Sequence, residues 1–156
     1  MYIRKSVLIG VTIVATLVGC IAITIAQEES TASHVIYFPH QNIAAAFTKG
    51  GTLIQGMSGA AKYRILTARR DKPGKVEIHD VDTDIIYAQS GTATFVTGGT
   101  PVAPRDTSPG EIRARSIQGG QSYFLSKGDV IIVPPGVPHW FKEVQAPFLY
   151  YVVKVR

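Results

Sequence analysis

The sequence predicts an all-β fold in a single domain, and three observations support this prediction. Thr, Val and Ile are frequent, and these β-branched residues favour strands over helices. The chain also contains 15 Gly and 9 Pro, which separate short apolar runs at intervals of a few residues. Its length of 156 residues suits one domain with its own core. Short strands joined by such turns form an antiparallel barrel or sandwich.

The first 26 residues predict a targeting segment ahead of the folded domain. Arg4 and Lys5 give a positive start, the run from Val7 to Ala26 is apolar and uncharged, and the chain turns polar at Gln27. This order is typical of a secretory signal cleaved at Gln27. Two alternatives stay open: a lipid anchor at Cys20, where the sequence resembles a bacterial lipobox, or an uncleaved membrane helix. Each predicts an exported protein, periplasmic or extracellular, that touches the membrane only through this segment.

We expect residues 27–62 to form an N-terminal extension and residues 63–156 to form the β-barrel domain. In the extension, Val35 to Phe38 predicts a strand, and the Ala-rich stretch from Gln41 to Phe47 predicts one or two helical turns.

The barrel domain reads as strands separated by turn residues. The run from Phe148 to Val155 is apolar almost throughout, which predicts that this strand is buried on both of its faces. Turns are expected at residues 71–74 and at Ser90-Gly91. The expected strands are Tyr63–Arg69, Lys75–His79, Asp84–Gln89, Thr92–Thr97, Gln121–Leu125, Val130–Val133 and Phe148–Val155.

A stiff turn holds a single imidazole near the C-terminus. The strand Val130 to Val133 is followed by three prolines and one glycine within residues 134–138, and then by His139, Trp140 and Phe141. Prolines exclude a helix interior or a central strand here, so the chain must turn. A proline-stiffened turn between strands suits the placement of one side chain.

A second group of polar residues could meet this imidazole. Residues two apart on a strand share a face, so Glu77 and His79 point the same way, and a partner strand beginning at Asp84 could bring its carboxylate beside them. If the barrel closes, His139 joins them. Two neutral imidazoles and two carboxylates carry a charge of −2, which one divalent cation would match. The alternative is that Glu77 faces solvent and Asp84 caps the preceding turn.

Both stretches resemble the motifs of the cupin superfamily. Gly128, Pro134, Gly136 and His139 have the spacing of the second cupin motif, although Glu143 replaces its usual final Asn. The first motif is resembled by Glu77, His79, Asp84 and Gly91, with Glu77 in place of a His and Asp84 in place of a Glu.

The resemblance implies a double-stranded β-helix, which is a jelly-roll barrel. Residue by residue, it implies that Glu77, His79, Asp84 and His139 bind a metal ion. Oxygen and nitrogen ligands without sulfur fit Mn, Fe, Zn, Ni or Co. It also implies a possible homodimer formed through sheet faces.

The segment from Gly98 to Gly120 separates the two motifs and is rich in turn residues. We expect a solvated excursion that contains an edge strand from Glu111 to Ile117. The alternative is a flap over the barrel mouth, in which Arg105, Arg113 or Arg115 meets an anionic ligand.

Two classes of function remain. The first is a metal-dependent enzyme of oxygenase or isomerase type that acts on a small polar molecule. The second is a non-catalytic binding module for a sugar or small acid, in a pocket lined by Tyr87, Trp140 and Phe141. Thiol catalysis is excluded because Cys20 is the only cysteine and lies in the targeting segment. The net charge is only +5 and the basic residues are scattered, so no nucleic-acid partner is expected.

Overall fold

The computed structural model of the chain describes residues 35–49, 51–54 and 62–156. The chain divides into residues 1–30 and 31–156, and the described residues all belong to the second unit. The targeting segment predicted for residues 1–26 therefore lies outside the described residues. No helix within the described ranges is long and apolar enough to cross a membrane.

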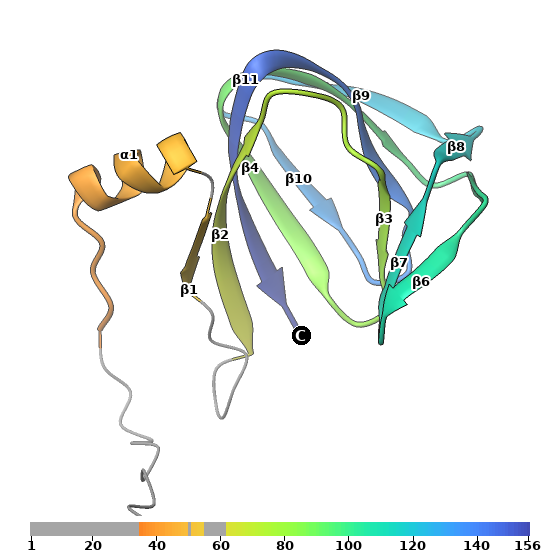
Figure 1. The fold of residues 1–156 in the computed structure, drawn as a ribbon, viewed down its shortest axis with the longest axis horizontal. Helices are drawn as coiled ribbons and strands as arrows, with labels where there is room; N and C mark the ends of the chain where they lie inside the picture. Colours follow the sequence, from red (N-terminus) through yellow and green to blue (C-terminus); the bar gives the residue numbers. More distant parts are fainter. Residues whose placement is uncertain (1–34, 50, 55–61) are drawn as a thin grey trace, which may run out of the picture. The chain divides into compact units, whose positions relative to one another are not determined.

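The described residues form one helix and eleven strands, which confirms the predicted all-β jelly-roll barrel (Figure 1). The helix α1 spans His40–Lys49. The strands are β1 (Gly51–Ile54), β2 (Tyr63–Arg70), β3 (Val76–His79), β4 (Thr83–Thr97), β5 (Thr100–Val102), β6 (Arg105–Ser108), β7 (Glu111–Ala114), β8 (Ser116–Gln118), β9 (Gln121–Leu125), β10 (Val130–Val133) and β11 (His139–Val155).

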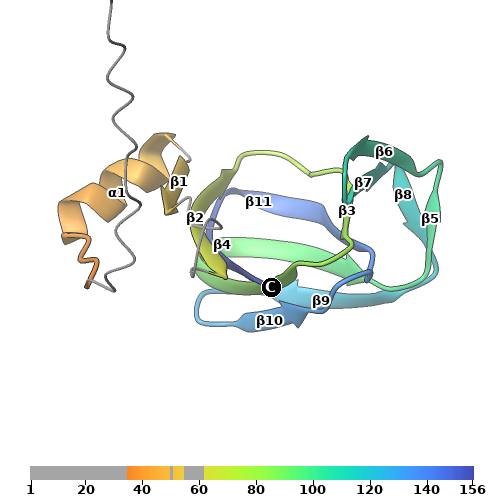
Figure 2. The ribbon, with the colours of Figure 1, turned by 90° about the horizontal axis from the view of Figure 1, so that it is seen from below.

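Two long antiparallel strands, β4 and β11, run through the whole barrel (Figure 2). The first part of β4 pairs with β10 and its last part with β9, while β11 pairs with β2 and, at His139, with β3. Each long strand therefore contributes to both ends of the barrel. The remaining pairs place β3 beside β7 and β7 beside β6, and a separate small sheet joins β5 to β8.

The predicted turn at Ser90-Gly91 is wrong, because β4 continues through it. Gly91 has a positive φ of 79°, and a Cβ atom placed there would lie 2.5 Å from the backbone oxygen of Pro147 on β11. Only glycine permits both this conformation and this close approach. Gly91 therefore marks a bend at which two paired strands cross closely, and not a hairpin.

The core lies inside the barrel, against the inward faces of the two long paired strands. Their alternate residues point inward, as the period of two requires. Phe95 and Phe148 are fully buried, and Phe141 contacts the ring of each, with centroids 4.7 and 5.6 Å away. The core comprises Ile86, Ala88, Ala93, Phe95, Leu125, Val133, Phe141, Phe148, Tyr150 and Val152. The last part of β11 buries only one face fully, in contrast to the burial on both faces expected from its sequence.

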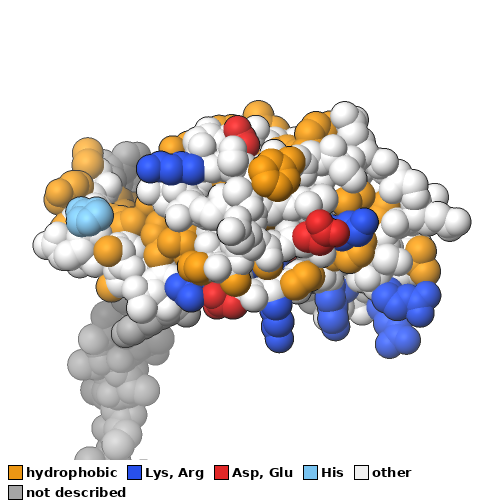
Figure 3. All heavy atoms as spheres, turned by 90° about the horizontal axis from the view of Figure 1, so that it is seen from above, with side chains coloured by type: hydrophobic (Ala, Val, Ile, Leu, Met, Phe, Trp, Pro, Cys, Tyr) orange, Lys and Arg blue, Asp and Glu red, His pale blue; other side chains and the backbone are white. Residues whose placement is uncertain are grey.

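The N-terminal extension follows its prediction in part. The helical turns predicted within residues 41–47 are present as α1, which packs Phe47 edge-to-face on Tyr151 with ring centroids 4.9 Å apart. The strand predicted for Val35 to Phe38 is wrong. These residues pair with no strand in the described part of the chain, and Val35 is 94% exposed, so neither backbone pairing nor burial favours a strand here. On the face shown in Figure 3, apolar, acidic and basic side chains are interspersed.

Candidate metal centre

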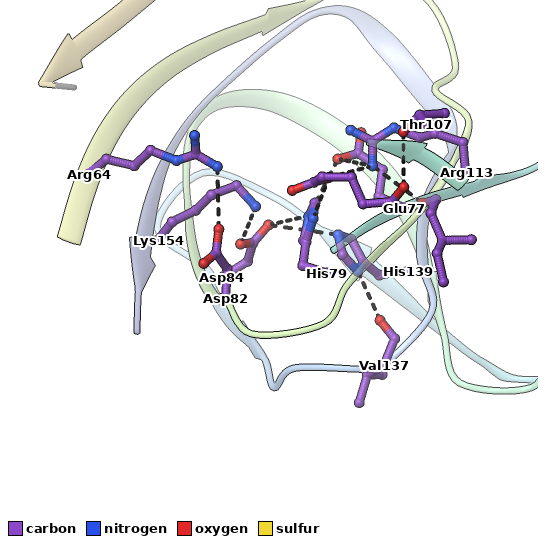
Figure 4. A network of polar contacts seen from close by, with 12 residues as sticks. Arg64, Glu77, His79, Asp82, Asp84, Thr107, Arg113, Val137, His139 and Lys154 are labelled. Atoms are coloured by element: carbon purple, nitrogen blue, oxygen red, sulfur yellow. Dashed lines mark hydrogen bonds and ion pairs between the residues drawn. The ribbon is translucent and has the colours of Figure 1, made fainter. Parts of the chain in front are cut away.

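Three strands bring the predicted ligands together (Figure 4). Glu77 and His79 lie two residues apart on β3, and His139, the first residue of β11, pairs directly with Glu77. Asp84 is the second residue of β4. The sequence had suggested that this strand pairs with β3, and that pairing is wrong. The neighbours of β3 are β11 and β7, so the Asp84 carboxylate arrives from another strand of the barrel.

The four side chains converge on a small volume. Glu77, His79 and His139 each offer one ligand atom, and these three atoms lie within 4.8 Å of one another. The Nε2 atom of His79 lies 3.7 Å from Glu77 Oε2 and 3.4 Å from Asp84 Oδ2. The Nε2 atom of His139 lies 3.7 Å from the same Asp84 oxygen. The two imidazoles and Asp84 are buried, and the Glu77 side chain is 26% exposed.

Both imidazoles are oriented by hydrogen bonds at their outer nitrogen. His139 Nδ1 lies 3.0 Å from the Val137 carbonyl oxygen, which can only accept, so Nδ1 carries the proton and donates it. His79 Nδ1 likewise lies 2.8 Å from the Glu111 carboxylate. Each Nε2 atom is thereby left for the centre. A hydrogen bond at the far nitrogen is the usual support of a metal-ligating histidine.

The Nε2 atom of His79 is buried and has no hydrogen-bond partner. A buried polar atom without a partner is uncommon and costs free energy. When His79 Nδ1 donates its hydrogen bond to Glu111, the Nε2 lone pair faces oxygens of Glu77 and Asp84. A proton or a metal ion on Nε2 would remove this repulsion between lone pairs. The residues present therefore fit a metal ion held by Glu77, His79 and His139.

The pKa shifts follow from burial and from these carboxylates. Burial lowers the pKa of His79, but the nearby carboxylate of Asp84, 3.4 Å from Nε2, together with that of Glu111, outweighs burial and raises that pKa above its usual value. Burial dominates at His139 and lowers its pKa. Burial raises the pKa of Asp84, but His79 and Lys154 outweigh it, so that pKa is lowered. In the metal-free protein a proton is therefore held more readily on His79 than on His139.

Metal affinity should consequently decrease as the pH is lowered, because His79 becomes protonated. A metal ion at Nε2 competes with the proton there, and the raised pKa of His79 starts this competition above about pH 6.5. Titration calorimetry with Mn²⁺ from about pH 8 to about pH 5.5 is expected to show affinity falling up to about tenfold per pH unit once His79 is protonated. An affinity that does not change over this range would contradict the assignment of His79 as a ligand.

The expected charge of −2 is wrong for the folded site, because cations surround the carboxylates. Lys154 Nζ lies 2.5 Å from Asp84, and Arg70 Nη2 lies 3.3 Å from Glu77. Arg113 lies 3.3 Å from Glu111 and 3.6 Å from Glu77. Three carboxylates thus meet three cations, and the cluster is neutral when both imidazoles are neutral. The case for a metal rests on the imidazole geometry and not on charge.

Sequence reasoning missed Glu111 and Lys154, and named Arg113 only as part of a possible flap, because cross-strand register brings these residues to the site. Glu111 pairs with His79, Arg113 pairs with Glu77, and Lys154 pairs with Asp84. Lys154 did leave a signal, since it continues the alternate positions of Tyr150 and Val152, which face the core. The predicted excursion around residues 98–120 therefore supplies part of the site through β7. Arg105 and Arg115 are exposed.

A cavity of about 300 Å³ adjoins the centre. Phe141 lines it, as predicted for a binding residue, whereas Tyr87 and Trp140 are not among the described residues that line it. Tyr87 and Trp140 each lie between two inward-facing residues of their strands, so their side chains point away from the barrel interior. Trp140 donates its indole N–H to the Gly74 carbonyl. The cavity is lined by Leu66, Thr67, Ala68, Arg70, Glu77, Asp84, Ile86, His139, Phe141, Tyr150, Val152 and Lys154.

The fold and the site define an all-β barrel protein with a candidate mononuclear metal centre. The chain belongs to the cupin family, whose sequence profile matches residues 74–155. No curated protein sequence shows significant similarity to it.

Solved structures similar to this chain share little sequence with it and therefore show its fold alone. A hydroquinone 1,2-dioxygenase in complex with Cd²⁺ and 4-hydroxybenzonitrile is 14% identical, with a TM-score of 0.52 and 80% of each chain covered. A protein from Bacillus halodurans is 13% identical, with a TM-score of 0.52; the match covers 81% of this chain and 83% of the Bacillus halodurans chain. A hydroquinone 1,2-dioxygenase from Sphingomonas sp. TTNP3 is 14% identical, with a TM-score of 0.46; the match covers 63% of this chain and 62% of that one.

Proposed function

We propose that this cupin is a metal-dependent enzyme of oxygenase type, in which Glu77, His79 and His139 hold a divalent metal ion and a small polar molecule occupies the adjoining cavity. The observation that carries the proposal is the buried Nε2 atom of His79, which has no hydrogen-bond partner among the described residues and lies within 4.8 Å of the ligand atoms of Glu77 and His139. Two imidazoles and one carboxylate leave coordination positions open, a set typical of non-haem Fe(II) oxygenases. This favours Fe among the Mn, Fe, Zn, Ni and Co that the ligand types admit.

The chain's own residues hold and shield the centre. Glu111 and the Val137 carbonyl fix the orientations of the two imidazoles. Lys154 binds Asp84 and so keeps that carboxylate at the edge of the centre. Phe95 stacks on the His139 ring at 5.9 Å, closing that side with apolar surface. A bound iron ion would supply the activation of dioxygen.

Metal content of ligand variants tests the proposal. We expect His79→Ala, His139→Ala and Glu77→Ala to lose most of the bound metal, because each removes one of only three ligands. Elemental analysis after equal Fe²⁺ loading measures this. His40→Ala is the matched control, since His40 is an exposed histidine on α1 and should not affect metal content. Equal metal content in all variants, or none in the wild type, would refute the metal site.

A non-catalytic binding module is the second candidate, and one observation favours it. The three carboxylates of the cluster are already paired with cations, so the folded site does not need a metal for charge balance. The cavity would then bind a small molecule directly. Absence of metal from the purified wild-type protein would make this the first choice.

We also infer that the native protein is exported and forms a homodimer. The charge-free run from Val7 to Ala26 supports export, and the uncovered apolar side chains of Tyr87, Val130 and Ile132 on neighbouring strands support a dimer through that sheet face. Native mass spectrometry of protein from its own cells should show a dimer of chains that begin near Gln27 or, if lipidated, at Cys20. A soluble monomer with an intact Met1 would contradict both inferences.

A further inference from the structure

We infer that the metal-loaded protein binds a small organic anion with an apolar body, and that Arg70 binds its charged group. This inference names the substrate class of the proposed metal site and rests on that proposal.

The first argument is charge balance. Without metal, the three carboxylates Glu77, Asp84 and Glu111 face the three cations Arg70, Arg113 and Lys154. A divalent ion held by Glu77 and the two imidazoles adds two positive charges to this cluster, or one where it displaces a proton from His79. Uncompensated charge in a buried site is costly. An anionic ligand would restore the balance.

The second argument is the state of the Arg70 guanidinium. It lines the cavity, and its Cζ lies 4.6 Å from the centre of the Phe141 ring. Its Nε donates to the Tyr150 hydroxyl at 2.8 Å, and its Nη2 donates to Glu77 at 3.3 Å. Its Nη1 group forms no hydrogen bond with any described residue. The guanidinium is therefore held in place with donors to spare, which suits the recognition of a carboxylate.

Gly74 makes room for this guanidinium. A Cβ atom at Gly74 would lie 2.6 Å from Arg70 Nη1, although the backbone of Gly74 needs no positive φ. A larger residue at this position would displace the arginine without removing its charge. Gly74 thus offers a second variant that tests the placement of Arg70.

The third argument is the composition of the cavity wall. Five side chains are apolar, namely Leu66, Ala68, Ile86, Phe141 and Val152. A sugar would leave some of its hydroxyl groups unpaired against this apolar part of the wall, and an inorganic anion would leave that part unfilled. The volume of about 300 Å³ is at the lower end for small-molecule pockets. A small acid with a hydrocarbon or aromatic body would place that body against the apolar side chains and its charged group against Arg70.

A second cavity of about 300 Å³ also borders Glu77 and Lys154, and it includes Arg64 and Arg113. Its wall holds Thr107 and Ser108 and lacks the apolar surface of the first cavity. An anion there would depend on Arg113 and not on Arg70, so the two locations can be told apart by mutation.

The test is calorimetric titration of the Fe²⁺-loaded full chain, kept anaerobic, with benzoate and hexanoate and with their neutral amides. We expect each acid to bind roughly 10- to 100-fold more tightly than its amide, the range for a charged hydrogen-bonded contact. The preference should shrink in metal-free protein and in Arg70→Gln. Arg69→Gln is the matched control, because Arg69 is the preceding residue on β2 and pairs with Asp71. Gly74→Ala should weaken the preference although Arg70 remains.

Metal content and thermal unfolding are measured on the same samples. Metal-loaded protein that binds the amides as well as the acids, or binds neither acid, overturns the inference and leaves the proposed metal site standing. A protein that holds no metal overturns both. A preference kept by folded Arg70→Gln and Gly74→Ala, or lost instead in Arg113→Gln, overturns the assignment to Arg70.

Discussion

Gly91→Ala is expected to destabilise the protein by about 4 kcal/mol or more, enough to leave much of it unfolded. Two costs combine at this position. An alanine would have to adopt a φ of 79°, which costs about 1–2 kcal/mol. Its Cβ would also lie 2.5 Å from the Pro147 oxygen and 3.1 Å from the Phe148 Cα, both of which are backbone atoms of the paired strand. Such atoms cannot move aside without breaking the β4–β11 ladder.

Gly136→Ala is the matched control for this prediction. Gly136 has nearly the same φ, 76°, but a Cβ atom there would meet nothing within 4 Å. Its backbone N–H donates to the His79 carbonyl at 2.8 Å, and alanine keeps that bond. We therefore expect a loss of only about 1–2 kcal/mol, from the conformation alone. Denaturant unfolding of both variants measures the difference; equal losses would show that the crossing at Gly91 is not tight.

Lys154→Met should destabilise the metal-free protein by about 3–5 kcal/mol, the range for removing one member of a buried ion pair. Both side chains of the pair are buried, with 10% of Lys154 and 5% of Asp84 exposed. Without the ammonium group, the pKa of Asp84 should rise, because Lys154 is one of the groups that lower it. The control is Lys142→Met, an exposed lysine on the same strand, for which we expect a change within about 0.5 kcal/mol.

Metal should rescue Lys154→Met more than it stabilises the wild type. Asp84 Oδ2 already lies 3.4 and 3.7 Å from the Nε2 atoms of the two imidazoles. Freed from Lys154, this carboxylate can join the ligands and balance part of the ion's charge. The rise in melting temperature on adding Fe²⁺ is therefore expected to be larger for the variant. An equal or smaller rise would show that Asp84 has no part in metal binding.

The fold could be predicted because its signals are local. Alternating β-branched residues predict strands, and the prolines of residues 134–138 predict the turn before His139. Errors arose where a local signal has two structural meanings. Glycine with a positive φ occurs both in hairpin turns and in bent strands, so Gly91 was predicted as a turn. A short apolar run such as Val35 to Phe38 becomes a strand only if a neighbour pairs with it.

Strand geometry alone predicted the site only as far as one strand extends, and Asp84 and His139 were assigned to it through the resemblance to the cupin motifs. Glu77 and His79 share a face because they are two residues apart, whatever the rest of the fold does. The cations and Glu111 come from pairings that no local pattern specifies. Trp140 is different, because its position next to His139 already implied that the two side chains face opposite sides of the strand. That signal was present in the sequence and was not used.

The long-range pairing at the centre also determines when the centre can form. Asp84 and Lys154 are 70 residues apart, His79 and Glu111 are 32 apart, and His139 must reach Glu77 across the barrel. Contacts between such distant residues form late, because closing the intervening loops costs entropy first. The ligand His139 follows Glu77 and His79 only after strands β4 to β10, so the three ligands can meet only once these strands have been made. Metal acquisition would be an event of the finished barrel, separate in time from its folding.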